Sequence, residues 1–177
     1  SHRMFLFIFK MFTEGNAALP EYGMEDIPKY LLRMLKTTKV HYRSTVHKID
    51  GQKVMLKTGH ILEFKKLIVA TFPEAILPNI NWSPSRYVGT GNFYFKAPES
   101  PMQDPIIGLV PDDSKLVNSF CVLSQVSPHY SDTGTPLISV TINKYVKGFD
   151  LNDYVRIVRE EMTELLGESV RHWEFVK

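Results

Sequence analysis

The sequence contains only one cysteine, Cys121, so no disulfide can form within the chain. A fold without disulfides does not depend on an oxidising compartment, and we expect a cytoplasmic protein. The apolar run around Cys121, residues 120–123, favours a small buried hydrophobe over a reactive thiol. Long hydrophobic stretches are also missing, because the apolar run at residues 4–12 is too short to span a bilayer and is interrupted by Lys10. We therefore expect no stable membrane insertion.

An excess of one charge sign is missing as well. The formal net charge is +2, and the Lys and Arg residues are scattered along the chain rather than grouped in a stripe. Binding to nucleic acid is therefore not expected. Hydrophobic residues make up 44% and charged residues 23%, a balance that is typical of globular domains and excludes a disordered chain.

The motifs of several enzyme classes are absent. No G-x-G-x-x-G follows a strand pattern, and there is no Walker loop, H-E-x-x-H, paired C-x-x-C or G-x-S-x-G. No histidine pairs with a second ligand at metal-binding spacing, so we expect no metal site. Ser127, His129 and Asp132 lie close together in a polar loop, where a solvated loop is favoured over a nucleophile–base arrangement. The sequence therefore predicts no catalytic side chain.

Two segments have the apolar spacing of amphipathic helices. Residues 26–36 carry Pro28 in the first turn, and residues 151–166 are followed by Gly167, which suits a helix end. The apolar residues 4–14 are predicted as a further helix.

The remaining apolar segments are predicted as strands. Asp50 and Gly51 together indicate a hairpin turn, and the continuous apolar run at residues 66–70 indicates a strand buried on both faces. The fold class that follows is α+β, with mixed or antiparallel sheets. The other predicted strands are, in chain order, residues 40–43, 45–49, 53–57, 61–64, 87–95, 106–110, 117–126, 137–144 and 170–176.

A connector is predicted in the middle of the chain, at Pro73, Pro78 and Pro84. Proline fixes φ and removes a backbone donor, so three of them in a short segment disfavour regular structure. We therefore divide the chain into residues 1–80 and residues 81–177.

The most specific pattern lies in residues 12–73. Its order of loop, helix, hairpin and apolar strand resembles the flavin-containing amine oxidase superfamily, which includes phytoene desaturase-like and protoporphyrinogen oxidase-like enzymes. The strings that carry the resemblance are Phe12-x-x-Gly15-Asn16-Ala17-Ala18-Leu19-Pro20-x-x-Gly23-Met24-x-x-Ile27-Pro28, then Val46-x-x-Ile49, and Leu67-Ile68-Val69-Ala70-Thr71-x-Pro73.

The resemblance implies an FAD cofactor and a set of residues near it. Val46 would contact the adenine through its backbone. Gly23 and Met24 would lie near the isoalloxazine edge, where a glycine lets the backbone approach a planar ring. Thr71 and Pro73 would lie beside the cofactor entrance.

The same resemblance assigns the two halves of the chain. Residues 1–80 would be an incomplete FAD domain of the NAD(P)-binding type, joined by a helix at residues 4–14 that starts the substrate domain. Residues 81–177 would form the antiparallel sheet of that substrate domain. Phe93 and Phe95 share one face of their strand and would line an apolar substrate cavity.

We therefore expect an internal fragment of an FAD-dependent oxidoreductase, which in full-length form moves a hydride from an amine or an apolar unsaturated substrate to the flavin. The glycine loop that holds dinucleotide phosphates is absent, so the isolated chain is expected to be inactive and to bind FAD weakly or not at all. The expected partner is a small-molecule substrate, and unpaired sheet edges would permit an oligomer. The alternative is a non-catalytic module that binds a partner or an apolar ligand through its sheet.

Overall fold

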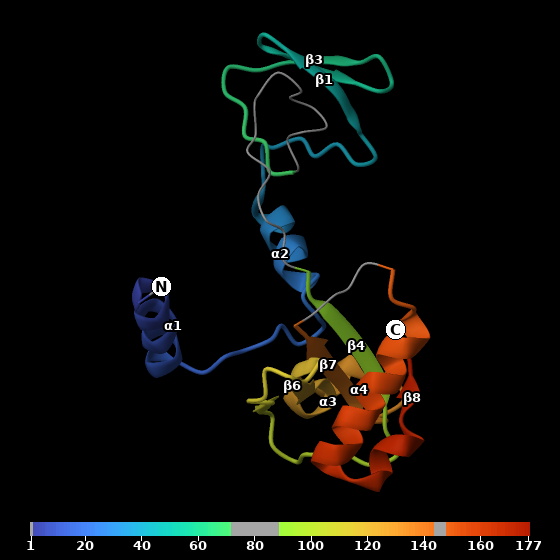
Figure 1. Cartoon of the computed structure of the whole chain (residues 1–177). Helices are drawn as coiled ribbons and strands as arrows, with labels where there is room; N and C mark the ends of the chain where they lie inside the picture. Colours follow the sequence, from blue (N-terminus) through green and yellow to red (C-terminus); the bar gives the residue numbers. More distant parts are fainter. Residues whose placement is uncertain (1, 72–88, 144–147) are drawn as a thin grey trace. The chain divides into compact units, whose positions relative to one another are not determined.

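The structure, a computed structural model, describes residues 2–71, 89–143 and 148–177 (Figure 1). The described part combines helices with antiparallel sheets, so the predicted α+β class is confirmed. The elements are, in chain order, α1 (His2–Glu14), α2 (Asp26–Met34), β1 (Val46–Asp50), β2 (Lys53–Leu56), β3 (Ile61–Glu63), β4 (Gly91–Lys96), β5 (Ile107–Leu109), β6 (Val117–Val122), α3 (Leu123–Val126), the 3₁₀ helix η2 (Pro128–Tyr130), β7 (Leu137–Ile142), α4 (Leu151–Leu166), the 3₁₀ helix η3 (Glu168–His172) and β8 (Glu174–Phe175).

The chain forms two compact units. Residues 35–87 make up the smaller unit, and residues 1–34 join residues 88–177 in the larger unit. This grouping differs from the predicted division after residue 80. One reason is that the loop before α2 is hydrogen-bonded to the second half of the chain, as described below.

The smaller unit contains an antiparallel sheet in the order β1-β2-β3. The predicted turn between its first two strands is present, with Gly51 at φ +55°, a conformation that glycine adopts without steric cost. In β2 the alternate residues Val54 and Leu56 are buried, each 8% exposed, so one face of this small sheet is apolar.

Two strands predicted in the smaller unit are not formed. Residues 40–43 are irregular, and Arg43 has φ +52°, which is incompatible with an extended strand. Residues 66–70 are also irregular, and Ile68 is 91% exposed. A strand buried on both faces needs neighbours on each side and covering layers. Among the described residues no strand pairs with this segment.

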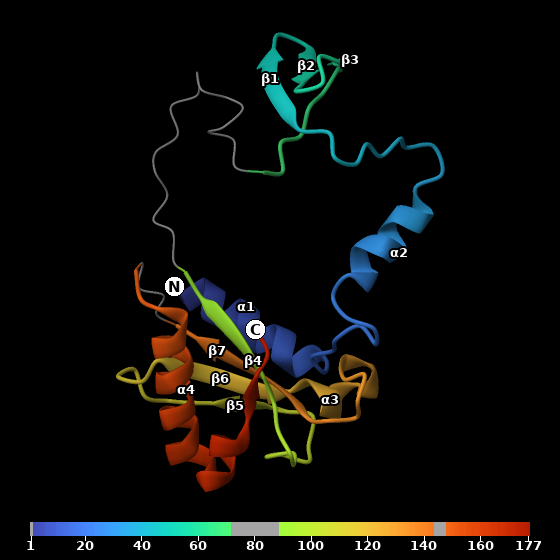
Figure 2. The ribbon, with the colours of Figure 1, turned by 90° about the vertical axis from the view of Figure 1, so that its right-hand side faces the viewer.

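The larger unit is built on an antiparallel sheet in the order β5-β6-β7-β4-β8 (Figure 2). Side chains alternate between its two faces, and the apolar set points to one of them. The residues on that face form a core with α4 and the end of the chain: Phe93, Phe95, Ala97, Val117, Phe120, Val122, Ile138, Val140, Ile142, Tyr154, Val158, Met162, Val170 and Trp173.

Helix α4 has the bounds that the sequence predicts. The Asp150 side chain accepts a hydrogen bond from the backbone N–H of Asn152 (2.9 Å), which satisfies one of the free donors at the helix start. Tyr154, Val158 and Met162 recur at four-residue spacing and are almost fully buried against the sheet.

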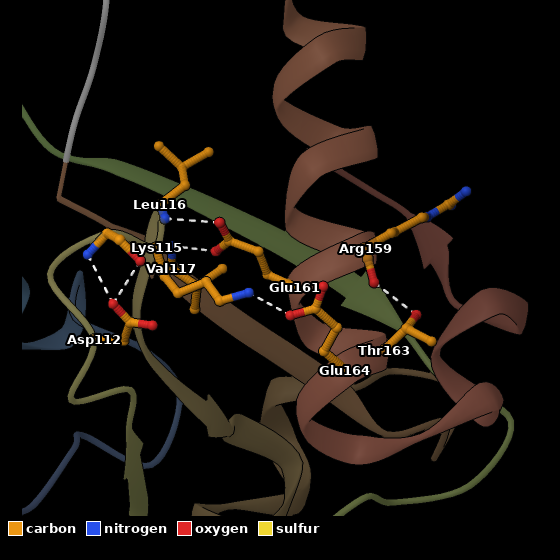
Figure 3. Close-up of polar contacts among 9 residues, drawn as sticks. Asp112, Lys115, Leu116, Val117, Arg159, Glu161, Thr163 and Glu164 are labelled. Atoms are coloured by element: carbon orange, nitrogen blue, oxygen red, sulfur yellow. Dashed lines mark hydrogen bonds and ion pairs between the residues drawn. The ribbon is translucent and has the colours of Figure 1, made fainter.

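Polar contacts hold α4 to the start of β6 (Figure 3). The two carboxylate oxygens of Glu161 accept hydrogen bonds from the backbone N–H groups of Leu116 (2.9 Å) and Val117 (2.8 Å). Lys115 forms an ion pair with Glu164, which lies about one turn after Glu161 in α4. The hydrogen bond that the Lys115 ammonium donates to Glu164 raises the pKa of Lys115. Because Glu164 is largely exposed, we attribute the attachment of α4 mainly to core packing and to Glu161.

Two predicted strands of the larger unit end differently in the structure. Residues 117–126 were expected to be one strand, but the strand stops at Val122 and α3 follows, because an apolar run does not by itself distinguish helix from strand. At the end of the chain, η3 occupies most of the segment predicted as a strand, and β8 contains only Glu174 and Phe175.

Two glycines allow side chains to pack directly on the backbone of the sheet. A Cβ at Gly91 would lie 2.9 Å from a side-chain carbon of Ile142, and a Cβ at Gly108 would lie 2.3 Å from a ring carbon of Phe120. The ring of Phe120 is only 5% exposed, so it has little room to move away.

The substitution Gly108→Ala is therefore expected to destabilise the larger unit by about 1–3 kcal/mol through overpacking. Urea unfolding followed by the fluorescence of the buried Trp173 would measure this change. The matched control is Gly15→Ala, because a Cβ at Gly15 meets no atom within 4 Å. Equal stability of the two variants would contradict the close packing of Gly108 on Phe120.

Candidate functional site

Val46 and Thr71, two residues predicted to bind the cofactor, line the same groove in the smaller unit. The groove has a volume of about 270 Å³ and lies between the apolar face of the hairpin and the irregular segment after it. Its lining carries no charged side chain: Val46, Ile49, Val54, Leu67, Ile68, Val69, Ala70 and Thr71. Pro73, the neighbouring prediction, lies outside the described residues.

The chemistry of this groove suits a flat apolar group better than a phosphate. Phosphates are bound by helix N-termini, glycine-rich backbone or basic side chains, and the lining includes neither glycine nor a basic residue. The strand pairing is irregular between Val46 and Lys48, so His47 has no paired partner. Such a bulge interrupts the ladder at the place where the backbone of Val46 is predicted to meet the ligand.

The loop formed by residues 20–24, the 20–24 loop, carries Gly23 and Met24 in the larger unit. Gly23 has φ +103°, and its N–H donates to the carbonyl of Pro20 (3.2 Å). The N–H of Asp26 then donates to the carbonyl of Gly23 (3.0 Å), which leads the chain into α2. No atom lies within 4 Å of a Cβ placed on Gly23, and Met24 is 60% exposed, so this side of the loop is open to a ligand.

The other side of the 20–24 loop is attached to the connection between β6 and β7. The Tyr130 hydroxyl donates to the carbonyl of Pro20 (2.8 Å), and the Ser127 hydroxyl donates to the carbonyl of Glu21 (3.0 Å). The rings of Tyr22 and His129 lie against each other, with centroids 4.4 Å apart. Sequence reasoning missed this attachment, because the partners are more than one hundred residues apart.

The geometry around His129 does not form a nucleophile–base pair. Its Nδ1 lies 3.5 Å from the Ser127 hydroxyl and 3.3 Å from a carboxylate oxygen of Glu21. A catalytic triad uses the two ring nitrogens for different partners, whereas here the same nitrogen faces both. Asp132 is exposed. Ser127 and His129 therefore serve the attachment of the 20–24 loop.

The predicted substrate residues Phe93 and Phe95 are packed in the core. Phe95 is fully buried and lies beside the rings of Trp173 and Phe175, with centroids 5.9 and 5.6 Å away. Phe93 is 5% exposed and contributes to the wall of a small pocket near the start of α4, of about 180 Å³. The face that carries them is covered by α4, so their strand offers a substrate little surface on this side.

The opposite face of the sheet, here called the open face, has a different composition. Its centre carries small polar side chains and Cys121, while Ile107 and Leu109 on β5 are 56% and 71% exposed. None of the side chains on this face is buried. By register, the open face consists of Asn92, Tyr94, Ile107, Leu109, Ser119, Cys121, Ser139 and Thr141.

A hydrogen-bond network joins β4 and β7 on the open face. The Asn92 side-chain oxygen accepts from the hydroxyls of Ser139 (2.9 Å) and Thr141 (3.2 Å), and its amide group donates to the hydroxyl of Tyr94 (2.9 Å). The face therefore offers polar groups at its centre and apolar groups at the β5 edge.

The family model described as flavin containing amine oxidoreductase matches residues 1–175. The chain belongs to the flavin-containing amine oxidoreductase family. The resemblance predicted from the sequence is thus confirmed.

Two solved structures share the fold. The chain superposes on the PF1083 protein from Pyrococcus furiosus with a TM-score of 0.66 and 18% identity, over 88% of this chain and 41% of that one. It superposes on reduced UDP-galactopyranose mutase with a TM-score of 0.61 and 11% identity, over 90% of this chain and 39% of that one. The chain therefore spans less than half the length of either structure. No curated protein matches it in sequence.

Within the described residues, no helix combines the length and the apolar character that crossing a bilayer requires. The same residues contain no group of three or more His, Cys, Asp or Glu side chains that could hold a metal ion.

Partial burial raises the pKa of the Cys121 thiol, and this leads to a testable expectation. The thiolate is the reactive form, so at pH 8 Cys121 should react with a disulfide reagent more slowly than free cysteine, and the rate should rise as the pH increases above 9. The chain unfolded in urea is the control and should react at the rate of free cysteine. Rapid labelling of the folded chain at pH 7 would contradict the partial burial of this thiol.

Proposed function

We propose that this chain is part of an FAD-dependent oxidoreductase in which the flavin accepts a hydride from an amine or an apolar unsaturated substrate. The observation that carries the proposal is the uncharged groove that brings Val46 and Thr71 together. A mostly apolar cleft is the kind of site that binds a planar base. The family match supports the flavin, and the groove supports FAD, whose adenine needs such a site.

The family resemblance also assigns Gly23 and Met24 of the 20–24 loop to the isoalloxazine edge. The open space at Gly23 would allow the backbone to approach the flat isoalloxazine ring closely. Met24 has an exposed, adaptable side chain that would pack against the same ring.

The substrate would lie over the open face of the sheet rather than against Phe93 and Phe95. This assignment follows from packing, because α4 covers the opposite face. The exposed Ile107 and Leu109 suit an apolar body, and the Asn92 network suits a hydrogen-bonding group. When bound, the flavin supplies the redox chemistry, and the residues of this chain bind and orient the substrate.

The proposal is tested by comparing the complete protein with the 177-residue chain. The complete protein should purify with the visible absorbance of oxidised flavin, release FAD on denaturation, and lose that absorbance anaerobically with a primary or secondary amine or a polyene. The isolated chain should take up little FAD in equilibrium dialysis, because it lacks a glycine loop for the phosphates. A complete protein without flavin would favour the alternative of a binding module.

The role of Val46 gives a second test, made in the complete protein. Val46→Pro removes the backbone N–H and should weaken FAD binding by about two- to tenfold, the factor for one net hydrogen bond. Val46→Ala keeps the N–H and should have a smaller effect. Proline is tolerated at the first residue of a strand, which is where Val46 stands in β1. Far-ultraviolet circular dichroism would verify the fold, and equal affinities for the two variants would exclude the backbone contact.

A further inference from the structure

We propose that Ser127 and Tyr130 are positioning residues that hold the 20–24 loop in place at the flavin edge. Through them, a ligand on the open face of the sheet would influence the flavin. This inference rests on the proposed function, because it takes Gly23 and Met24 to lie beside the isoalloxazine ring. It goes beyond that function by assigning a role to the connection between β6 and β7, which contains none of the residues proposed to contact a ligand.

The hydrogen bonds fix the loop backbone at two consecutive residues. The carbonyl of Pro20 accepts both from the Tyr130 hydroxyl (2.8 Å) and from the N–H of Gly23 (3.2 Å), so the tyrosine holds the same carbonyl that closes the turn. The carbonyl of Glu21 accepts from the Ser127 hydroxyl (3.0 Å). Displacing either side chain would therefore release the turn that carries Gly23.

Ser127 is only 7% exposed, and buried hydroxyl groups need hydrogen-bond partners. Its hydroxyl donates to Glu21 and accepts from the N–H of His129 (3.3 Å), so it links the 20–24 loop to η2. Because Ser127 is buried, losing either of these hydrogen bonds would cost free energy that water does not restore. The link is therefore specific rather than incidental.

The rings of Tyr22 and His129 provide a third attachment. They lie 4.4 Å apart, and the Nδ1 of His129 faces the carboxylate of Glu21 at 3.3 Å. The side chains of His129 and Glu21 are both well exposed, so this contact is expected to contribute less than the two part-buried hydrogen bonds.

The connection that carries Ser127 and Tyr130 leads directly to the open face. It starts at Leu123, directly after Val122 at the end of β6, and leads into β7, where Ser139 is the register partner of Cys121. Within it, the hydroxyl of Ser124 accepts from the N–H of Leu137 (3.2 Å), which ties α3 to the start of β7. A substrate that contacts Cys121 and Ser139 would therefore act on β6 and β7, the two strands joined by the connection that holds the 20–24 loop.

The experiment uses the complete flavoprotein with Tyr130→Phe and Ser127→Ala. The matched control is Ser131→Ala, because Ser131 makes the same type of bond within the β6–β7 connection, to Thr135, without contacting the 20–24 loop. The first readout is hydrogen exchange at the Gly23 amide, which is expected to become about two- to tenfold faster in the first two variants only. The second is quenching of flavin fluorescence by iodide, which should rise in the same two variants.

The second readout separates positioning from simple stabilisation. Faster exchange at Gly23 with unchanged flavin quenching would overturn the inference, and so would unchanged exchange. Absence of flavin from the unmodified protein would instead refute the proposed function. If Ser127→Ala does not fold, Ser127→Thr replaces it, because this variant keeps the hydroxyl and the extended backbone at this position suits threonine. Ser127→Thr should show the same exchange and quenching as the unmodified protein. A folded Ser127→Thr protein with altered exchange or quenching would also contradict the role of the hydroxyl.

Discussion

The packing of α4 on one face of the sheet determines how the rest of the larger unit is used. Phe95 has no exposed surface because rings from the end of the chain and the side chain of Arg159 surround it; the Arg159 guanidinium lies 5.9 Å from its ring centroid. A residue buried in this way makes many small attractive contacts, and together these dominate the stability of a domain. Since one face is committed to this core, only the other remains for a ligand.

The attachment of the 20–24 loop is a second consequence of the way in which the larger unit is assembled. The loop belongs to the first part of the chain, yet its carbonyls are bound by side chains from the β6–β7 connection. The residues proposed to meet the flavin are therefore supported by the unit that is proposed to hold the substrate. This arrangement explains why residues 1–34 group with residues 88–177 in one compact unit.

The sequence predicted the local elements better than the long-range ones. Helix α4 was predicted with its bounds, because its cap, its apolar spacing and its terminal glycine act over a few residues. The strand predicted at residues 66–70 does not form, because its stability depends on neighbouring strands that no local pattern specifies. The pattern alone did not show that Val46 and Thr71 line the same groove. Alternation likewise could not indicate that α4 would cover Phe93 and Phe95.

The separation between the two sides of the loop attachment also constrains the order of folding. The bonds from Ser127 and Tyr130 span 106 and 110 residues along the sequence. Closing a loop of that length costs more conformational entropy than forming the hairpins of the sheet, because the paired residues of a hairpin are near neighbours in the chain. During synthesis on a ribosome, the 20–24 loop could be attached only after residue 130 had emerged. The proposed flavin edge would therefore be completed more than one hundred residues after the loop itself was made.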